Sequence, residues 1–332
     1  MALRICTYNV EWFDHLFNDD NTMKTGANEQ RRFHAIRDVL QAIGADLIGV
    51  VEAPNTSADR TQSTVVRLET FANWAGISTT KAIVGTISAG GQELALLWDP
   101  AKFDITHQPG GKTGSRSNPP FTGEFYFDTD DDRIFEAYKF YRPPLEAQVT
   151  VKGANQQFYL MLVHTKSKGI FNSVDLLHWQ RESLRNRRKL YAECTWTRRR
   201  VDEWLDEQRD VIVMGDINDG PEMDYYEFQF GRSAVEIIMG SIFDPDRVLR
   251  NYAGQPKWTR YGWSPSSTRF EDQMTGKNVN VLIDHILISK KIQVKAGKPH
   301  KIWNPYEDDD AKPLKAALLE ASDHFPVTLD LA

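Results

Sequence analysis

The apolar run at residues 211–214 passes directly into Gly215-Asp216-Ile217-Asn218, and this transition constrains the fold most strongly. Four large apolar residues in a row, two of them valines, predict a strand buried in a sheet. Residues two positions apart in an extended segment point to the same side, so Asp216 and Asn218 face one spot where the strand ends. Many α/β folds keep their chemistry at strand ends. The stretch therefore indicates either a site at the edge of a sheet or a polar turn after a core strand.

Polar residues follow several other predicted strands in the same way. Asn9, Glu52 and His164 each close an apolar segment. Asp323 and His324 come just before the last apolar segment of the chain. This repetition favours a site assembled from several strand ends over a set of unrelated polar turns.

Asp284 lies inside the apolar strand predicted at residues 279–289. A buried carboxylate without a partner is costly, so Asp284 needs one, and a histidine is the natural choice. A carboxylate fixes the tautomer of the imidazole and raises its basicity. The neighbouring His285 alternates with Asp284 and is predicted to face the other way in a structural role, and Asp219 is predicted to be a solvated loop acid.

The order of the predicted elements indicates an α/β protein. Helical spacing of apolar residues predicts helices at 29–43 and 64–75, each placed between predicted strands. Strands dominate afterwards, except for a long helical pattern at 175–208 that we expect to contain a break. Because the first and last strands both adjoin candidate site residues, we expect one domain over residues 1–332 whose ends meet.

Charge is distributed unevenly along the chain. The net charge of −6 argues against a protein that binds nucleic acid over its whole surface, but it does not exclude a local basic groove. Residues 181–200 contain eight Lys or Arg and two Asp or Glu. This stretch is either a solvated helix face or a surface that follows a chain of phosphates.

The two cysteines, Cys6 and Cys194, form neither a disulfide framework nor a metal-binding Cys-x-x-Cys pair. The N-terminus leads straight into a strand and lacks the features of a signal peptide. No apolar run approaches the length needed to cross a bilayer. We therefore expect a cytoplasmic protein without stable membrane association.

The candidate residues suit metal-assisted hydrolysis. The sequence has no Gly-x-Ser-x-Gly motif and no cysteine beside a histidine, which argues against a serine or cysteine nucleophile. Oxygen donors such as Asn9 and Glu52 suit a hard cation, and magnesium prefers few carboxylates together with waters and substrate phosphates. The set indicates a metal that binds a phosphate oxygen, a carboxylate–histidine pair that activates water, and donors for the transition state.

Six short motifs in order carry a resemblance to a known family. The chain resembles the endonuclease/exonuclease/phosphatase superfamily, the DNase I-like fold, at Tyr8-Asn9-Val10-Glu11, Val51-Glu52, Val163-His164-Thr165-Lys166-Ser167, Gly215-Asp216-Ile217-Asn218, Ile283-Asp284-His285-Ile286 and Ser322-Asp323-His324-Phe325-Pro326. The resemblance implies an α/β, four-layered sandwich of two packed mixed β-sheets flanked by helices. Inserts are expected near residues 13–28, 107–132 and 170–209.

The resemblance also implies a metal site and a phosphate site. Asn9 and Glu52 would help to bind Mg²⁺, with Glu52 as the main ligand and Asp323 in support, and Mn²⁺ is the other candidate ion. Arg142 resembles the phosphate-contacting arginine of the family. Lys166, near His164, would contact phosphate, and Lys168 is a further candidate for this contact.

The catalytic roles follow from the same resemblance. Asp216 would orient or deprotonate the attacking water, and Asn218 would hold the scissile phosphate. His324, paired with Asp284, would be the second candidate for the base or a donor to the transition state. His164 would hydrogen-bond to a phosphate oxygen or the leaving group. The choice of base stays open.

The leading functional hypothesis is a magnesium-dependent phosphodiesterase, a nuclease with DNA or RNA as its substrate. The basic stretch at 181–200 favours it. The alternative is a phosphatase or phosphodiesterase that acts on a small molecule or a lipid head group. A catalytically inactive binding scaffold is a minor alternative, because all the core site positions are filled.

Overall fold

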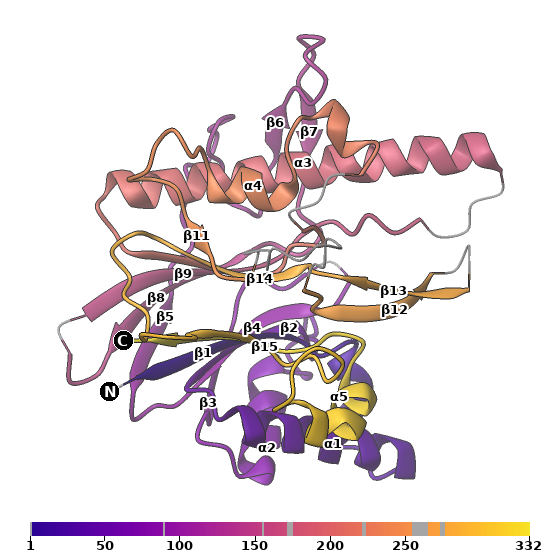
Figure 1. The fold of residues 1–332 in the computed structure, drawn as a ribbon, viewed down its shortest axis with the longest axis vertical. Helices are drawn as coiled ribbons and strands as arrows, with labels where there is room; N and C mark the ends of the chain where they lie inside the picture. Colours follow the sequence, from indigo (N-terminus) through magenta and orange to yellow (C-terminus); the bar gives the residue numbers. More distant parts are fainter. Residues whose placement is uncertain are drawn as a thin grey trace.

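Two six-stranded β-sheets lie face to face in the centre of the molecule, and helices cover their outer faces (Figure 1). This arrangement comes from a computed structural model, which describes residues 2–88, 90–154, 156–170, 175–220, 224–253, 265–272 and 276–332. The layers confirm the expected α/β, four-layered sandwich of two mixed sheets flanked by helices.

The first sheet joins the two ends of the chain. Its strand order is β15-β16-β1-β2-β4-β3, with the bounds β1 Leu3–Asn9, β2 Leu47–Ala53, β3 Lys81–Val84, β4 Glu93–Trp98, β15 His300–Ile302 and β16 Val327–Leu331. β1 runs parallel to β2 and antiparallel to β16. The first and last long strands are therefore neighbours, as expected from the candidate residues beside them.

The second sheet contains the apolar run with which the sequence analysis began. Its order is β11-β14-β10-β9-β8-β5, with the bounds β5 Phe103–His107, β8 Leu145–Val151, β9 Gln156–His164, β10 Val211–Asp216, β11 Arg250–Asn251 and β14 Asp284–Ile288. β10 lies in the middle, parallel to β9 and antiparallel to β14. Two hairpins accompany the sheets: β6 Phe125–Phe127 with β7 Glu136–Tyr138, and β12 Thr268–Asp272 with β13 Lys277–Val281.

Apolar side chains from both sheets fill the space between them. The sheets approach so closely at Gly49 that a Cβ there would lie 2.6 Å from Cδ1 of Leu162 and 2.7 Å from Cε of Met214. Such interiors are packed to crystal-like density, so the two sheets hold a fixed relation to one another. This rigidity positions the strand ends that carry polar residues.

Helices form the two outer layers. α1 (Ala27–Ile43), α2 (Thr64–Ala75) and α5 (Lys315–Ala321) cover the first sheet, while α3 (Leu176–Asp206) and α4 (Ala234–Met239) cover the second (Figure 1). Short 3₁₀ turns complete the elements: η1 Phe13–Leu16, η2 Glu227–Gln229 and η3 Lys312–Leu314. Among the described residues, no helix is both long and apolar enough to cross a bilayer.

Two expectations about individual elements were wrong. α3 is one continuous helix of 31 residues without the expected break. Its buried positions, such as Leu190, Trp196 and Trp204, keep it on the sheet along most of its length. Asp284 begins β14 and does not lie in its middle. The acid therefore sits at the end of the sheet.

Candidate active site

Strand register brings the candidate residues to one end of the two sheets. Asp216 pairs with His164 on the parallel strand β9 and with Asp284 on the antiparallel strand β14. In the other sheet, Asn9 ends β1 and Glu52 lies near the end of the adjacent β2. Because both sheets present these ends to the same side, residues more than 200 positions apart in sequence come into contact.

A buried acid–histidine pair lies at the centre of the site. Nδ1 of His324 lies 2.8 Å from Oδ2 of Asp284, and Ser267 donates its hydroxyl to the same oxygen at 2.7 Å. Nε2 of His324 lies 3.9 Å from Oδ2 of Asp216. Asp284 thus has the histidine partner that its burial requires, and His324 turns its other ring nitrogen towards Asp216. The ligand atoms of these three residues lie within 4.8 Å of one another.

The proton affinities of this group are strongly shifted. Burial lowers the pKa of His324, but the charge and hydrogen bond of Asp284, with Asp216 and Asp323, raise it overall to about 10. Burial raises the pKa of Asp216 to about 7, Asp284 adds to the rise, and His324 opposes it. A carboxyl group with a pKa near neutrality beside a protonated imidazole suits proton transfer at physiological pH.

His164 approaches Asp216 from β9. Its Nε2 lies 3.5 Å from Oδ2 of Asp216. Burial holds the pKa of His164 well below the usual value, and the charges of Arg142 and His324 lower it further. Its Nδ1 is buried without a hydrogen-bond partner in the part of the chain that the structure describes. A neutral imidazole can donate one hydrogen bond to an oxygen placed in the site.

Asn9 connects the two sheets at the site. Its Nδ2 donates to Oδ2 of Asp216 at 3.1 Å and lies 3.4 Å from Oε1 of Glu52. Glu52 has a φ of +57°, at the point where the pairing of β2 with β4 is irregular. Its Oε2 accepts the Trp12 backbone N–H at 2.9 Å and the Gln92 side chain at 2.8 Å. Left-handed backbone in a non-glycine residue is uncommon and often marks a functional position.

Glu11 joins the site although the sequence analysis did not name it as a candidate. Burial raises its pKa, the charges of Asp323 and Glu52 raise it further, and Arg32 opposes them. The carboxylates of Glu52 and Asp323 therefore lie near enough to repel that of Glu11. Glu11 stands two residues after Asn9, and this spacing was the signal that could have identified it.

Arg142 belongs to the same end of the sheets through Gln92, which was also missed. Nη1 of Arg142 donates to Oε1 of Gln92 at 2.5 Å, and Gln92 in turn bonds to Glu52. Burial lowers the pKa of Arg142, while the charges of Glu52, Glu193 and Asp216 oppose this shift. A guanidinium beside the carboxylate group is suited to bind phosphate. No sequence pattern marked Gln92, because it lies in a turn ahead of an ordinary strand.

Asn218 and Lys166 lie at the edge of the site, each two residues beyond the end of a strand of the second sheet, β10 and β9. The amide of Asn218 donates to the backbone carbonyl of Thr165 at 3.0 Å, and its backbone N–H bonds to Asp216. The backbone N–H of Lys166 donates to Glu193 of α3 at 2.7 Å. Burial lowers the pKa of the Lys166 amine, and nearby Lys189, Arg142 and Arg185 lower it further while Glu193 opposes them. A cluster of positive charge therefore borders the site.

Two expectations about nearby polar residues were wrong. Lys168, a candidate for phosphate contact, directs its amine to Asp219 at 2.6 Å and to Glu227 at 3.0 Å. Asp219 is fully buried and is no solvated loop acid. Its backbone carbonyl contacts His285 Nε2 at 2.9 Å, and His285 is buried in a structural role, as expected. These contacts fix the loop that carries Asn218.

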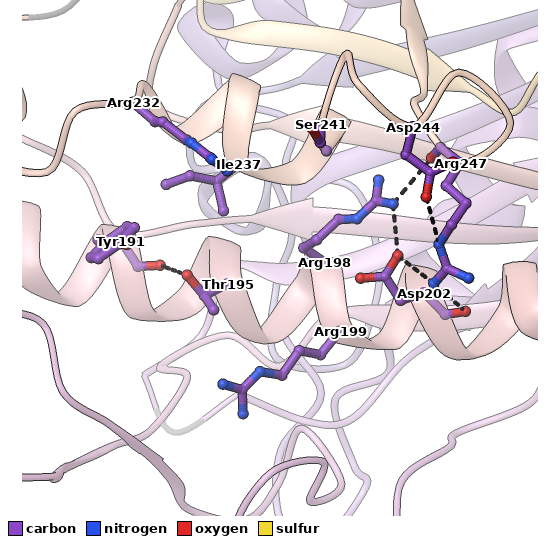
Figure 2. A pocket seen from close by; sticks show the side chains of 11 residues that line it. Tyr191, Thr195, Arg198, Arg199, Asp202, Arg232, Ile237, Ser241, Asp244 and Arg247 are labelled. Atoms are coloured by element: carbon purple, nitrogen blue, oxygen red, sulfur yellow. Dashed lines mark hydrogen bonds and ion pairs between the residues drawn. The ribbon is translucent and has the colours of Figure 1, made fainter.

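A separate basic pocket of about 390 Å³ lies in the outer layer between α3 and α4 (Figure 2). Arg198 and Arg247 both contact Asp202, at 2.7 and 2.8 Å. Figure 2 shows these guanidinium groups directed at carboxylates and backbone. The pocket is part of the packing of α4 on α3 and contains none of the candidate site residues.

Fold and site together define the DNase I-like class of four-layered sandwiches. The chain belongs to the endonuclease/exonuclease/phosphatase family, whose model matches residues 6–324. This confirms the resemblance noted from the six motifs. Membership indicates phosphoester hydrolase activity in general, and enzymes of this family depend on a divalent metal.

Solved structures share this fold at low sequence identity. An endonuclease/exonuclease/phosphatase from Bacteroides vulgatus is 15% identical with a TM-score of 0.54, covering 100% of this chain and 99% of that one. The catalytic domain of human nocturnin, solved with a bound sulfate anion, is 13% identical with a TM-score of 0.51, covering 100% and 94%. Truncated TDP2 of Caenorhabditis elegans is 11% identical with a TM-score of 0.52, covering 99% and 97%. No curated protein matches the chain.

Proposed function

We propose that this protein is a magnesium-dependent phosphodiesterase that hydrolyses DNA or RNA by attack of an activated water, with Mn²⁺ as the other candidate ion. The observation that carries the choice of nucleic acid is a row of basic side chains on α3 that leads to Lys166. The site supports the hydrolytic chemistry, and the basic row supports a long polyanionic substrate.

The oxygen donors at the ends of β1 and β2 fit a hard divalent cation. Glu52 is the main ligand in this proposal, with Asn9 and Asp323 beside it, and Glu11 joins them. Burial raises the pKa of Glu11, and the charges of Asp323 and Glu52 raise it further; a cation between these carboxylates would relieve their repulsion. Asn9 Oδ1 accepts the Glu11 backbone N–H at 3.0 Å and keeps a second lone pair. A bound ion would polarise a phosphate oxygen as a Lewis acid.

The buried group at the centre supplies proton transfer. Asp216 is the candidate for the base, while His324, with its pKa raised to about 10, is protonated at neutral pH and acts as a donor to the transition state, oriented by the 2.8 Å contact of its Nδ1 with Asp284. His164 offers a hydrogen bond to a phosphate oxygen or to the leaving group. Asn218 and Arg142 hold the scissile phosphate, since both lie beside Asp216 or the carboxylates that surround it.

The basic row on α3 favours a polynucleotide over a small phosphoester. Arg181, Arg185 and Lys189 are four residues apart, so they lie on one face of the helix. Arg181 and Arg185 are exposed, and Lys189 and Arg185 both act on the pKa of Lys166. Within the row, Arg185 contacts Glu182 at 3.3 Å and Lys189 contacts Glu193 at 3.7 Å. The row thus extends the positive charge away from the site along one line.

Cleavage of DNA tests the proposal directly. Plasmid and single-stranded DNA are incubated with the wild-type protein and with Asp216→Asn, with Mg²⁺ or with EDTA. We expect the wild type to cut with Mg²⁺ only, and Asp216→Asn to lose at least about 100-fold in rate, the lower range for loss of a general base. Phosphate release from small phosphoesters without cutting of either DNA would contradict the nuclease proposal and favour a phosphatase.

A further inference from the structure

An exposed aromatic side chain lies at each end of a line of hydrogen bonds that crosses the site. The line runs from the Trp12 backbone N–H to Glu52, from Glu52 to Gln92, and from Gln92 to Arg142. At its far end, the Arg142 guanidinium lies 5.7 Å from the ring centroid of Tyr141. Trp12 is 46% exposed and Tyr141 is 48% exposed. The backbone of Trp12 thus contacts the acid assigned to the metal, and the ring of Tyr141 lies beside the arginine assigned to phosphate.

The backbone of Trp12 adopts an unfavourable conformation next to Glu52. Glu11 and Trp12 are consecutive non-glycine residues with positive φ, at 35° and 49°. A bulky residue in this region is a true outlier and persists only where its surroundings enforce it. Here Arg32 donates to the Val10 and Glu11 carbonyls, and Phe13 is buried directly after Trp12.

Each of the two rings is fixed by a neighbouring group and is about half exposed. The indole of Trp12 stacks on His15, with ring centroids 5.1 Å apart and planes 7° from parallel. Tyr141 is held at its hydroxyl end, since a Cβ on Gly90 would fall 1.4 Å from that oxygen. Large rings that are fixed in place and about half exposed are suited to stack on flat aromatic groups of a ligand.

We propose that Trp12 and Tyr141 stack on the two nucleobases that flank the cleaved phosphate, and that the substrate is single-stranded nucleic acid. This inference rests on the proposed function. Bases in a duplex are stacked and paired, so they cannot meet two protein rings on either side of one phosphate, whereas unpaired bases can. Every base has a π-face, so this contact selects for a single strand and not for a sequence.

Cleavage kinetics test the proposal with two strands. One is a single-stranded oligonucleotide, and the other carries the same phosphates with its bases replaced by abasic tetrahydrofuran units. We expect Trp12→Ala and Tyr141→Ala each to raise KM for the first strand by about 5- to 150-fold, the range for loss of one base–aromatic stack, with little change in kcat. Neither variant should change KM for the abasic strand, and Trp12→Phe should recover most of the wild-type KM.

Trp74 supplies a matched control. It is 39% exposed but lies in the outer helical layer on α2, beside Arg37 and His34. Trp74→Ala should leave KM for both strands unchanged. Thermal unfolding of each variant checks that the fold is retained.

The outcomes separate this inference from the proposed function. Cleavage of the base-bearing strand with unchanged KM in Trp12→Ala and Tyr141→Ala would overturn the stacking proposal and leave the nuclease intact. Binding of the base-bearing strand is measured by tryptophan fluorescence in the wild type and in Trp12→Phe. A fluorescence change that requires Trp12, together with absence of cleavage, would support stacking and overturn the nuclease proposal. Neither cleavage nor binding would overturn both.

Discussion

At the scale of single residues, the contact between Asp284 and His324 carries a specific expectation. An asparagine at 284 cannot balance a charged imidazolium and holds the ring tautomer less firmly. We expect Asp284→Asn to lower kcat by about 10²- to 10⁴-fold, the usual contribution of general acid–base catalysis, with the fold intact. Rates on a cleavable substrate, with circular dichroism as a check of folding, measure this effect.

Asp330→Asn is the control for that substitution. Asp330 is also a buried acid with a partner, Arg4 at 2.7 Å, but it lies on β16 outside the site. Asp330→Asn should lower the free energy of unfolding without lowering kcat of the folded protein. A similar fall in kcat for both variants would show that Asp284 acts through the fold and not through His324.

The raised pKa of His324 predicts a pH-dependent stability. The pKa of His324 is about 10 in the folded protein, against 6.5 for the free side chain in an unfolded chain, so the folded protein binds this proton more tightly. Its contribution is therefore fully present below about pH 6.5 and is lost as the pH rises through about 10. Without divalent metal, the urea midpoint of the wild type should fall more steeply across this window than that of His324→Gln. If the urea midpoints of the two proteins changed with pH in parallel, the raised pKa of His324 would be contradicted.

At the scale of elements, the basic stretch on α3 differs in burial from one face of the helix to the other. Arg200 is fully buried and pairs with Glu146 of β8, and Arg188 pairs with Asp130 at 2.6 Å. These contacts attach α3 to the second sheet and to the loop between β6 and β7. Residues 181, 185 and 189 lie on a more exposed face of the helix, where Arg185 contacts Glu182 and Lys189 contacts Glu193. Neither of the two interpretations of residues 181–200 describes the whole stretch, because burial differs from one face to the other.

The α3 row carries its own prediction. Replacing Arg181, Arg185 and Lys189 together by Glu should weaken binding of single-stranded DNA and reduce the slope of log K against log salt by about 2. Each lost phosphate contact on a single strand removes about 0.7 of that slope. Binding titrations at several salt concentrations measure it.

A second triple variant provides the comparison. Lys291, Lys295 and Lys298 are exposed and follow β14, at the end of that strand away from Asp284. Their replacement by Glu changes the net charge by the same amount. An equal fall of the slope in both variants would mean that overall charge, and not the α3 row, governs binding.

At the scale of the whole molecule, the last strand completes the first sheet between β15 and β1. Leu329 of β16 is fully buried and faces the core between the two sheets. Leu329→Ala should lower the free energy of unfolding by about 2–5 kcal/mol because it leaves a cavity. Urea denaturation measures this loss. Leu319→Ala, at a position 45% exposed on α5, should stay within about 0.5 kcal/mol, and a similar loss in both would contradict the assignment.

The organisation of residues 1–332 as one domain stays a prediction. The inserts expected from the resemblance also stay predictions. Residues 13–28 contain η1, residues 107–132 contain β6, and residues 170–209 contain α3. All three lie outside the strands whose ends carry the site.

Apolar patterning in the sequence predicted the strand ends, and the resemblance carried by six motifs implied the layers and the candidate site. The period of an extended chain drew attention to Asp216 and Asn218. In the structure β10 ends at Asp216 and Asn218 has a φ of +53°, so the two residues meet through the bond from the Asn218 backbone N–H to Asp216. The need of Asp284 for a histidine followed from the cost of burying a lone carboxylate.

Tertiary structure decided which polar groups meet. Glu11 and Gln92 join the site. Asp219 is buried and pairs with Lys168, and the backbone N–H of Trp12 donates to Glu52. Local periodicity contains no information about these outcomes, since each depends on a partner supplied by the packing of another strand or turn. The sequence predicts which face a side chain occupies, and only the packing of the two sheets determines what lies opposite to it.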